Sequence, residues 1–115
     1  MGLDLPSALA TSFGGGVGGQ GEVCGVISGA ALLVGLWGGR EKAGDKEAYD
    51  RVRSKMREFI AGFQGEHGKL LCRELTGYDL RSPEGEKRFK DDPERRIKCQ
   101  RFVETAAVLV TKLLA

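Results

Sequence analysis

The chain has 115 residues, of which 41% are hydrophobic and 30% are charged, which is ordinary for a single globular domain over residues 1–115. Its formal net charge of +2 is too small to attract nucleic acid or an anionic membrane by bulk electrostatics. Between residues 73 and 101, nine Lys and Arg residues are interleaved with seven Asp and Glu residues, so we expect a solvated surface there.

Helical signals dominate the first half of the chain, and no segment alternates apolar and polar residues as a strand does. A short helix is expected over about residues 5–13, ended by the glycines at 14–16. A second helix is expected from Glu22 to Trp37. The uncharged run 23–39 is just long enough to cross a bilayer, but seven of its 17 residues are Gly, Ser or Cys. We interpret it as a buried core helix and expect no membrane span.

The third expected helix runs from Asp45 to Phe63 and has the clearest amphipathic pattern. Asp45 is a suitable N-cap for it. Its apolar stripe consists of Tyr49, Val52, Met56, Phe59, Ile60 and Phe63.

Three further helical signals follow in the second half. A short turn of helix is expected from Cys72 to Gly77, and another helix begins with Ser82 as cap and Pro83 at the first position. The last helix carries an apolar face made of Cys99, Phe102, Val103, Ala106, Val110, Leu113 and Leu114. The sequence therefore predicts an all-α fold, a small bundle of four main helices around the Gly/Ala-rich second helix.

The glycines suggest close contacts. "GVGGQG" at 16–21 fits a dinucleotide-binding spacing, but no βαβ unit surrounds it, so a flexible turn is the better interpretation. Gly25, Gly29 and Gly35 each cost roughly 1 kcal/mol inside a helix. Gly25 and Gly29 share one face, which either a neighbouring helix or a cofactor held by Cys24 could approach closely.

The three cysteines, Cys24, Cys72 and Cys99, are the candidate redox or ligand residues. An odd count cannot form a purely internal disulfide framework, and no secretory signal is recognisable, so we expect a reducing, cytoplasmic setting. Each cysteine is expected near the start of a helix, where free N–H groups favour thiolate over thiol. A last helix that begins at Pro93 would instead place Cys99 in its second turn and weaken this effect. Arg73 lies next to Cys72 in the sequence, and Arg95, Arg96 and Lys98 lie near Cys99.

The spacing of these cysteines excludes a local metal motif. They are 48 and 27 residues apart, with no C-x-x-C, so any shared site must be assembled by folding. His67, five residues before Cys72, is a candidate fourth ligand or a base for Cys24, although a solvated loop histidine is the simpler interpretation.

Three ordered motifs carry a family resemblance. They are "SFGGGVGGQGEVCGVISG" at 12–29, "LCRELTG" at 71–77 and "KCQRFVETAAVLV" at 98–110. The chain resembles the C-GCAxxG-C-C family of redox-active proteins, which has four cysteines and a CGAxxG motif. Val26 replaces the motif alanine, and the family's first cysteine, on a helix upstream of the glycine loop, is absent here.

The resemblance implies an all-helical redox protein or an iron–sulfur or other metal-binding protein, with a role in electron transfer. Cys24, Cys72 and Cys99 would be the redox residues or metal ligands. A four-thiolate site cannot be completed within this chain. Another ligand, a second protomer in a homodimer, a longer chain or a degenerate site would each account for that.

The sequence leaves two other function classes open. In a structural or interaction module the cysteines are core residues and the charged helix faces dock a partner. A hydrolase has little support, because one histidine and no recognisable Ser–His–Asp set leave few groups for acid–base chemistry. The redox partner, the substrate and the oligomeric state are not indicated by the sequence.

Overall fold

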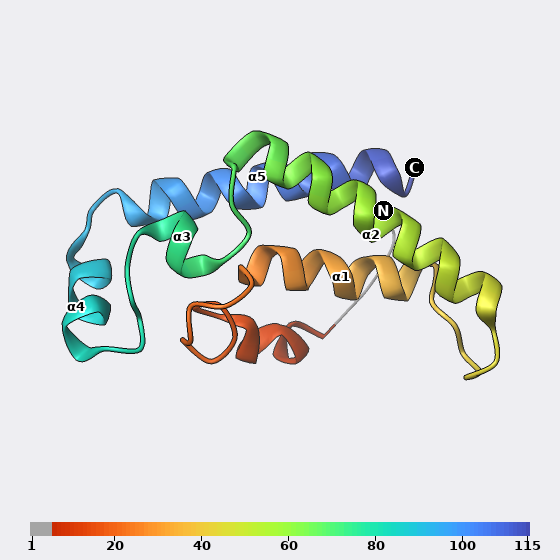
Figure 1. Ribbon diagram of the computed structural model, residues 1–115, viewed down its shortest axis with the longest axis horizontal. Helices are drawn as coiled ribbons and strands as arrows, with labels where there is room; N and C mark the ends of the chain where they lie inside the picture. Colours follow the sequence, from red (N-terminus) through yellow and green to blue (C-terminus); the bar gives the residue numbers. More distant parts are fainter. Residues whose placement is uncertain (1–5) are drawn as a thin grey trace.

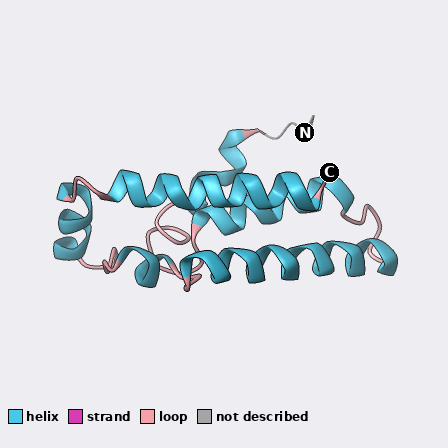
Figure 2. Ribbon diagram, turned by 90° about the horizontal axis from the view of Figure 1, so that it is seen from above, coloured by secondary structure: helices cyan, strands magenta, loops and turns pink. Residues whose placement is uncertain are grey.

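The computed structural model describes residues 6–115, and this part of the chain consists of helices joined by loops (Figures 1 and 2). The elements in chain order are the 3₁₀ helix η1 (Ser7–Phe13) and the α-helices α1 (Gly25–Gly38), α2 (Lys46–His67), α3 (Cys72–Thr76), α4 (Pro83–Asp91) and α5 (Arg95–Leu113). No strand occurs among the described residues, where the extended pairing is limited to an isolated antiparallel bridge between Val23 and Leu71. The all-α prediction is confirmed.

Three long helices form the body of the molecule. α1, α2 and α5 each contact the other two, with α2 running in the opposite direction to α1 and α5 (Figure 1). η1 packs on α1, and α4 lies at one end of the body. The molecule is elongated, with dimensions of 46 × 25 × 22 Å. The Gly/Ala-rich helix is central, as expected, because three elements pack against it.

The buried face of each long helix repeats every three or four residues. α1 buries Ile27, Ala30 and Val34, and α5 buries Phe102, Ala106 and Val110. Phe59 and Phe63 of α2 are fully buried between them. Such a spacing places one stripe of each helix against its neighbours.

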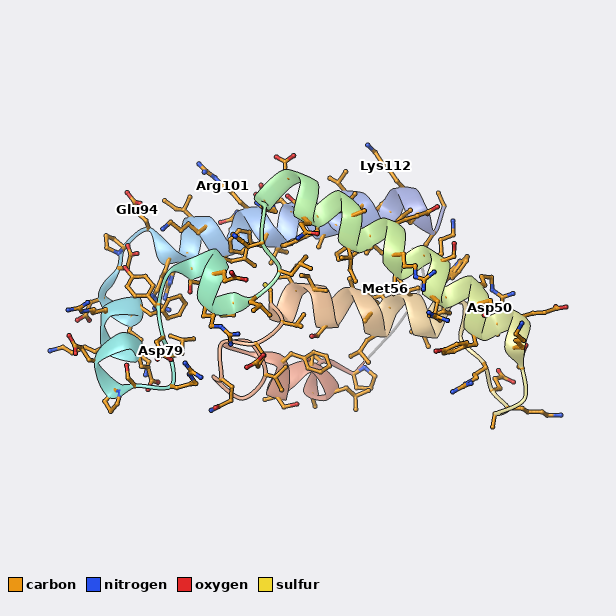
Figure 3. All side chains as sticks on the ribbon, in the orientation of Figure 1. Asp50, Met56, Asp79, Glu94, Arg101 and Lys112 are labelled. Atoms are coloured by element: carbon orange, nitrogen blue, oxygen red, sulfur yellow. The ribbon has the colours of Figure 1, made fainter. Side chains whose placement is uncertain are left out.

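Two residues expected in these stripes are exposed instead. Tyr49 is 43% exposed because the first turns of α2 extend beyond α1 and α5, and there it contacts the guanidinium groups of Arg40 and Arg53 (Figure 1). Val103 is 53% exposed because one residue step of about 100° from Phe102 turns it out of the core. Arg101 and Lys112 project from the outer side of α5, the helix that carries Val103 (Figure 3).

Helix ends follow the local signals closely. The Asp45 side chain accepts a hydrogen bond from the Ala48 N–H at 3.1 Å, and Ser82 accepts one from the Gly85 N–H at 2.9 Å. α2 continues past the expected Phe63 to His67, where Gly68 ends it with a φ of 79°. Among the described helices, none combines the length and apolar composition needed to cross a membrane.

α1 begins at Gly25, later than the expected Glu22. The residues before it are used in pairing with the segment around Leu71. The Cys24 N–H donates to the Leu70 carbonyl at 3.0 Å, and the Cys72 N–H donates to the Glu22 carbonyl at 2.6 Å. This pairing is a tertiary contact, and it holds the entry to α1 extended.

Candidate functional site

The three cysteines line one cavity of about 320 Å³, which we call the cysteine pocket. Cys24 is the N-cap of α1, Cys72 is the first residue of α3, and Cys99 lies in the second turn of α5. The rest of the pocket is lined by Ala10, Phe13, Gly14, Gly15, Gly16, Gly25, Val26, Leu75, Thr76, Phe89 and Phe102. Three cysteines far apart in the sequence therefore line the same cavity.

The Val23–Leu71 bridge brings two of the cysteines to the same side. In an antiparallel pair the side chains of Cys24 and Cys72 lie on the face opposite to Val23 and Leu71. They are diagonal neighbours, for which Cα atoms are about 7–8 Å apart. A disulfide needs Cα atoms about 4.4–6.8 Å apart, so joining a diagonal pair requires the two segments to move closer. All three thiols are free.

The glycine loop fits closely against this pairing. Gly16 is buried and has a φ of 72°. A Cβ atom on it would lie 2.7 Å from the Cys72 Cβ and 2.6 Å from the Glu22 nitrogen. Gly16 therefore lets the loop approach Cys72 more closely than any other residue would allow.

Burial determines the ionisation of the thiols. It raises the pKa of Cys24, although the N–H groups of Val26 and Ile27 oppose the shift. Burial is also the largest cause of the raised pKa of Cys72, to which negative charge on Cys24 and Cys99 adds. The mutual influence of these charges agrees with their shared pocket.

Cys99 departs furthest from the sequence-based expectation. Burial and negative charge on Cys24 raise its pKa, and the opposing effect of Arg95 and Lys98 is smaller. α5 begins at Arg95, so Cys99 lies in the second turn, away from the free N–H groups of the helix end. The prediction that the helix starts favour thiolate is therefore wrong, because burial is the largest cause of the pKa shift at all three cysteines and raises the pKa each time.

Arg73 does not face the thiols as a free cation. Its guanidinium forms an ion pair with the Glu22 carboxylate at 3.1 Å and also donates to the Gly21 carbonyl at 3.4 Å. The residue instead links the end of the glycine loop to α3.

His67 does not line the cysteine pocket. Its Nε2 lies 2.8 Å from the Thr105 Oγ1, and its ring packs against Phe63 and Phe102 with centroids 4.8 Å away in both cases. It is half-buried, so it is neither a fourth ligand in this arrangement nor a solvated loop residue. Its contacts tie the end of α2 to α5.

The two candidate cofactor-binding glycines differ. Gly25 lines the cysteine pocket, and a Cβ atom on it would lie 2.9 Å from the Phe13 carbonyl oxygen. Gly29 does not line the pocket, and no described atom outside its own helix turn lies within 4 Å of its Cβ position. A neighbouring element therefore approaches closely at Gly25, whereas none of the described residues does so at Gly29 or at Gly35.

Three phenylalanines of the pocket wall were not anticipated as site residues. Phe102 was expected only as a core residue, and Phe13 and Phe89 belong to short helices whose patterns gave no sign of a shared cavity. Thr76 was also missed; it donates a hydrogen bond to the Cys72 carbonyl at 2.8 Å.

The donor set does not fit a four-thiolate cluster within one chain. The sequence holds three cysteines. Within residues 6–115, no group of three or more His, Cys, Asp or Glu side chains is placed to hold a metal ion. The pocket as described is a site of neutral thiols in apolar surroundings.

A comparison of the sequence with models of protein families gives a match over nearly the whole chain. The family model "Putative redox-active protein (C_GCAxxG_C_C)" matches residues 2–113. No curated protein and no solved structure matches the chain. With nearly its whole length matched, the chain belongs to the C_GCAxxG_C_C family of redox-active proteins.

Proposed function

We propose that the cysteine pocket is a thiol–disulfide redox site in which Cys24 and Cys72 form the exchanging pair. The observation that supports this most is that three thiols from three separate elements line one cavity. Cys24 and Cys72 are diagonal neighbours across the bridge, so their sulfurs can be joined when the two segments move closer. Two thiols give up two electrons and two protons as the S–S bond forms.

Cys99 is the more exposed of the three. Cys24 and Cys72 are each 8% exposed, whereas Cys99 is half-buried. We propose that Cys99 is the thiol through which a redox partner first makes contact, passing oxidation on to the inner pair by thiol exchange. Resting free thiols suit a reducing compartment, so the proposal includes a cytoplasmic location.

The test is an equilibration in mixtures of reduced and oxidised dithiothreitol under anaerobic conditions. The expected product has lost two hydrogens in mass and contains a Cys24–Cys72 disulfide in its peptide map. Cys24→Ser and Cys72→Ser should abolish that product, whereas Cys99→Ser should retain it. Helix content by circular dichroism controls for folding. A disulfide lost in Cys99→Ser, or none in the wild type, contradicts the assignment.

A metal centre on the same cysteines is the main rival. It would need a further ligand, for example from a second copy of the chain. Visible absorption, iron content and size-exclusion chromatography after anaerobic preparation separate it from bare thiols. Coloured protein with bound iron would replace the disulfide proposal.

A structural role has one specific observation in its favour. Cys24 belongs to the hydrophobic core cluster, together with Ile27 and Phe102. If the three cysteines had only a packing role, their replacement by alanine would lower the stability of the protein. The wild-type thiols would then react with one another no more readily than with a thiol reagent added in solution.

A further inference from the structure

The wall of the cysteine pocket has no charge. Among the described residues that line it, none is acidic or basic. Thr76 is the one polar side chain besides the thiols, and its hydroxyl is already bonded to the Cys72 carbonyl. Arg95 lies over the Phe89 ring, 5.3 Å from its centroid, but does not line the pocket. A phosphate, carboxylate or ammonium group placed among the lining residues would lose its water without gaining a charged partner from them.

Three phenyl rings from three elements line the same pocket as the thiols. They belong to Phe13 of η1, Phe89 of α4 and Phe102 of α5. Tyr78 packs edge-on against Phe89, with centroids 5.9 Å apart, and His67 packs edge-on against Phe102. These contacts hold the two rings in place, and aromatic walls favour a flat ring that can stack or meet them edge to face.

The volume limits what can enter. Ligand pockets span about 300–1,000 Å³, so a cavity of about 320 Å³ is at the small end. It suits one or two fused rings, and it is too small and too apolar for a dinucleotide.

We propose that the electron acceptor for this dithiol site is a small, uncharged quinone bound in the cysteine pocket. The inference rests on the proposed redox function and names its substrate class. One thiol adds through its sulfur to a ring carbon as its proton passes to one quinone oxygen. The second thiol then attacks that sulfur, breaking the S–C bond, as its proton passes to the other oxygen. The protein gains one S–S bond, and the quinone leaves as a hydroquinone that carries the two electrons and two protons of the thiols.

The experiment compares two naphthoquinones that differ in charge. Fully reduced protein is mixed anaerobically with 2-methyl-1,4-naphthoquinone or with 1,4-naphthoquinone-2-sulfonate. Hydroquinone is followed by absorbance, and the protein disulfide by mass. Each rate is divided by that of the same quinone with N-acetylcysteine, which removes differences in intrinsic reactivity. We expect saturation with the uncharged quinone and a normalised rate about tenfold or more above that of the sulfonate.

A pocket-wall variant tests the location. Phe89 is only partly buried, so Phe89→Ala should fold, and we expect it to raise the half-saturating quinone concentration about tenfold. Val108→Ala, at a site 53% exposed and outside the pocket, is the control and should behave as wild type.

The outcomes separate the two proposals. Equal normalised rates for both quinones, or a stable arylated protein without a disulfide, would overturn the quinone inference if dithiothreitol still produces the Cys24–Cys72 disulfide. Absence of the disulfide with every oxidant would overturn the redox function itself.

Discussion

At the scale of single residues, the glycine loop makes the strongest demand on side-chain identity. Five of its glycines have positive φ angles, Gly15, Gly16, Gly18, Gly19 and Gly21. Among them, Gly16 also lies in close contact with Cys72 and Glu22, whereas the Cβ position of Gly18 has no described atom within 4 Å. The same backbone angle therefore occurs in a crowded and in an open setting.

This pair gives a matched test. Gly18→Ala should cost about 1 kcal/mol, the strain of a left-handed alanine alone. Gly16→Ala should cost about 2–4 kcal/mol, because the new Cβ must also push against backbone and against Cys72. Urea unfolding measures both. Equal losses would mean that the loop does not pack against Cys72 as described.

Val17 is the one described residue other than glycine with a positive φ, at 65°. A β-branched side chain is strained there, and at 44% exposure it buries little surface in return. Val17→Gly should therefore raise the free energy of unfolding by about 0.5–1 kcal/mol, net of the added entropy of the unfolded chain. Thermal or urea unfolding checks the sign, and a loss of stability would contradict it.

At the scale of elements, local signals in the sequence were enough to locate most helix ends. Asp45 and Ser82 are N-caps because their oxygens reach N–H groups three residues ahead, a contact that needs no distant partner. The start of α1 was misplaced because the Val23–Leu71 bridge joins segments 48 residues apart, and no local pattern encodes such a pairing.

The glycines of α1 show the same contrast between what a local sequence signal predicts and what only the folded structure determines. Their cost in a helix is a local property, but whether a neighbour fills the space is a tertiary one. Phe13 approaches Gly25 because η1 folds back onto α1, whereas nothing described covers Gly29. The sequence alone treats the two as equivalent.

Alanine substitutions at Gly25 and Gly29 distinguish the crowded position from the open one. Gly29→Ala should stabilise the protein by about 1 kcal/mol through helix propensity, with no clash. Gly25→Ala should destabilise it by about 1–3 kcal/mol, because the methyl group meets the Phe13 carbonyl oxygen, which cannot move without η1. Circular dichroism during urea unfolding gives both values. Stabilisation by both substitutions would show that η1 does not pack on α1.

At the scale of the whole molecule, the three buried cysteines together make the stability of the protein depend on pH. Their convergence was predictable as a hypothesis from the resemblance, but the direction of their pKa shifts was not. Burial is a property of the assembled pocket, and it outweighs both the N–H groups at Cys24 and the cations beside Cys99. The sequence shows only the nearby charges.

Raised thiol pKa values make the protein weaker at alkaline pH. In the unfolded chain thiols lose their protons near pH 8.5, whereas Cys24, Cys72 and Cys99 keep theirs to higher pH when folded. The unfolded state then binds fewer protons than the folded state. The stability that the thiols contribute below about pH 8.5 is therefore lost as the pH rises from there through the pKa values of the folded thiols. Anaerobic urea unfolding between pH 7.5 and 10 should show a steeper decline in wild type than in the triple alanine variant.

Other alkaline titrations are common to both proteins. The hydrogen bond to Asp92 raises the pKa of Tyr78, for example, and the alanine variant retains that pair. The difference between the two curves therefore isolates the thiols. Parallel curves would mean that the cysteines are not buried as a group.

The cysteine pocket also has a consequence for biosynthesis. Its walls come from η1 and from α5, near opposite ends of the described chain. A growing polypeptide on the ribosome can form the hairpin of α1 and α2 early, because those helices are neighbours in the sequence. Cys99 and Phe102 emerge after η1, α1, α2 and α3, so the nascent chain carries Cys24 and Cys72 without the α5 side of their pocket until α5 has been synthesised. Chemistry that depends on all three thiols begins only after α5 has emerged and folded against the earlier helices.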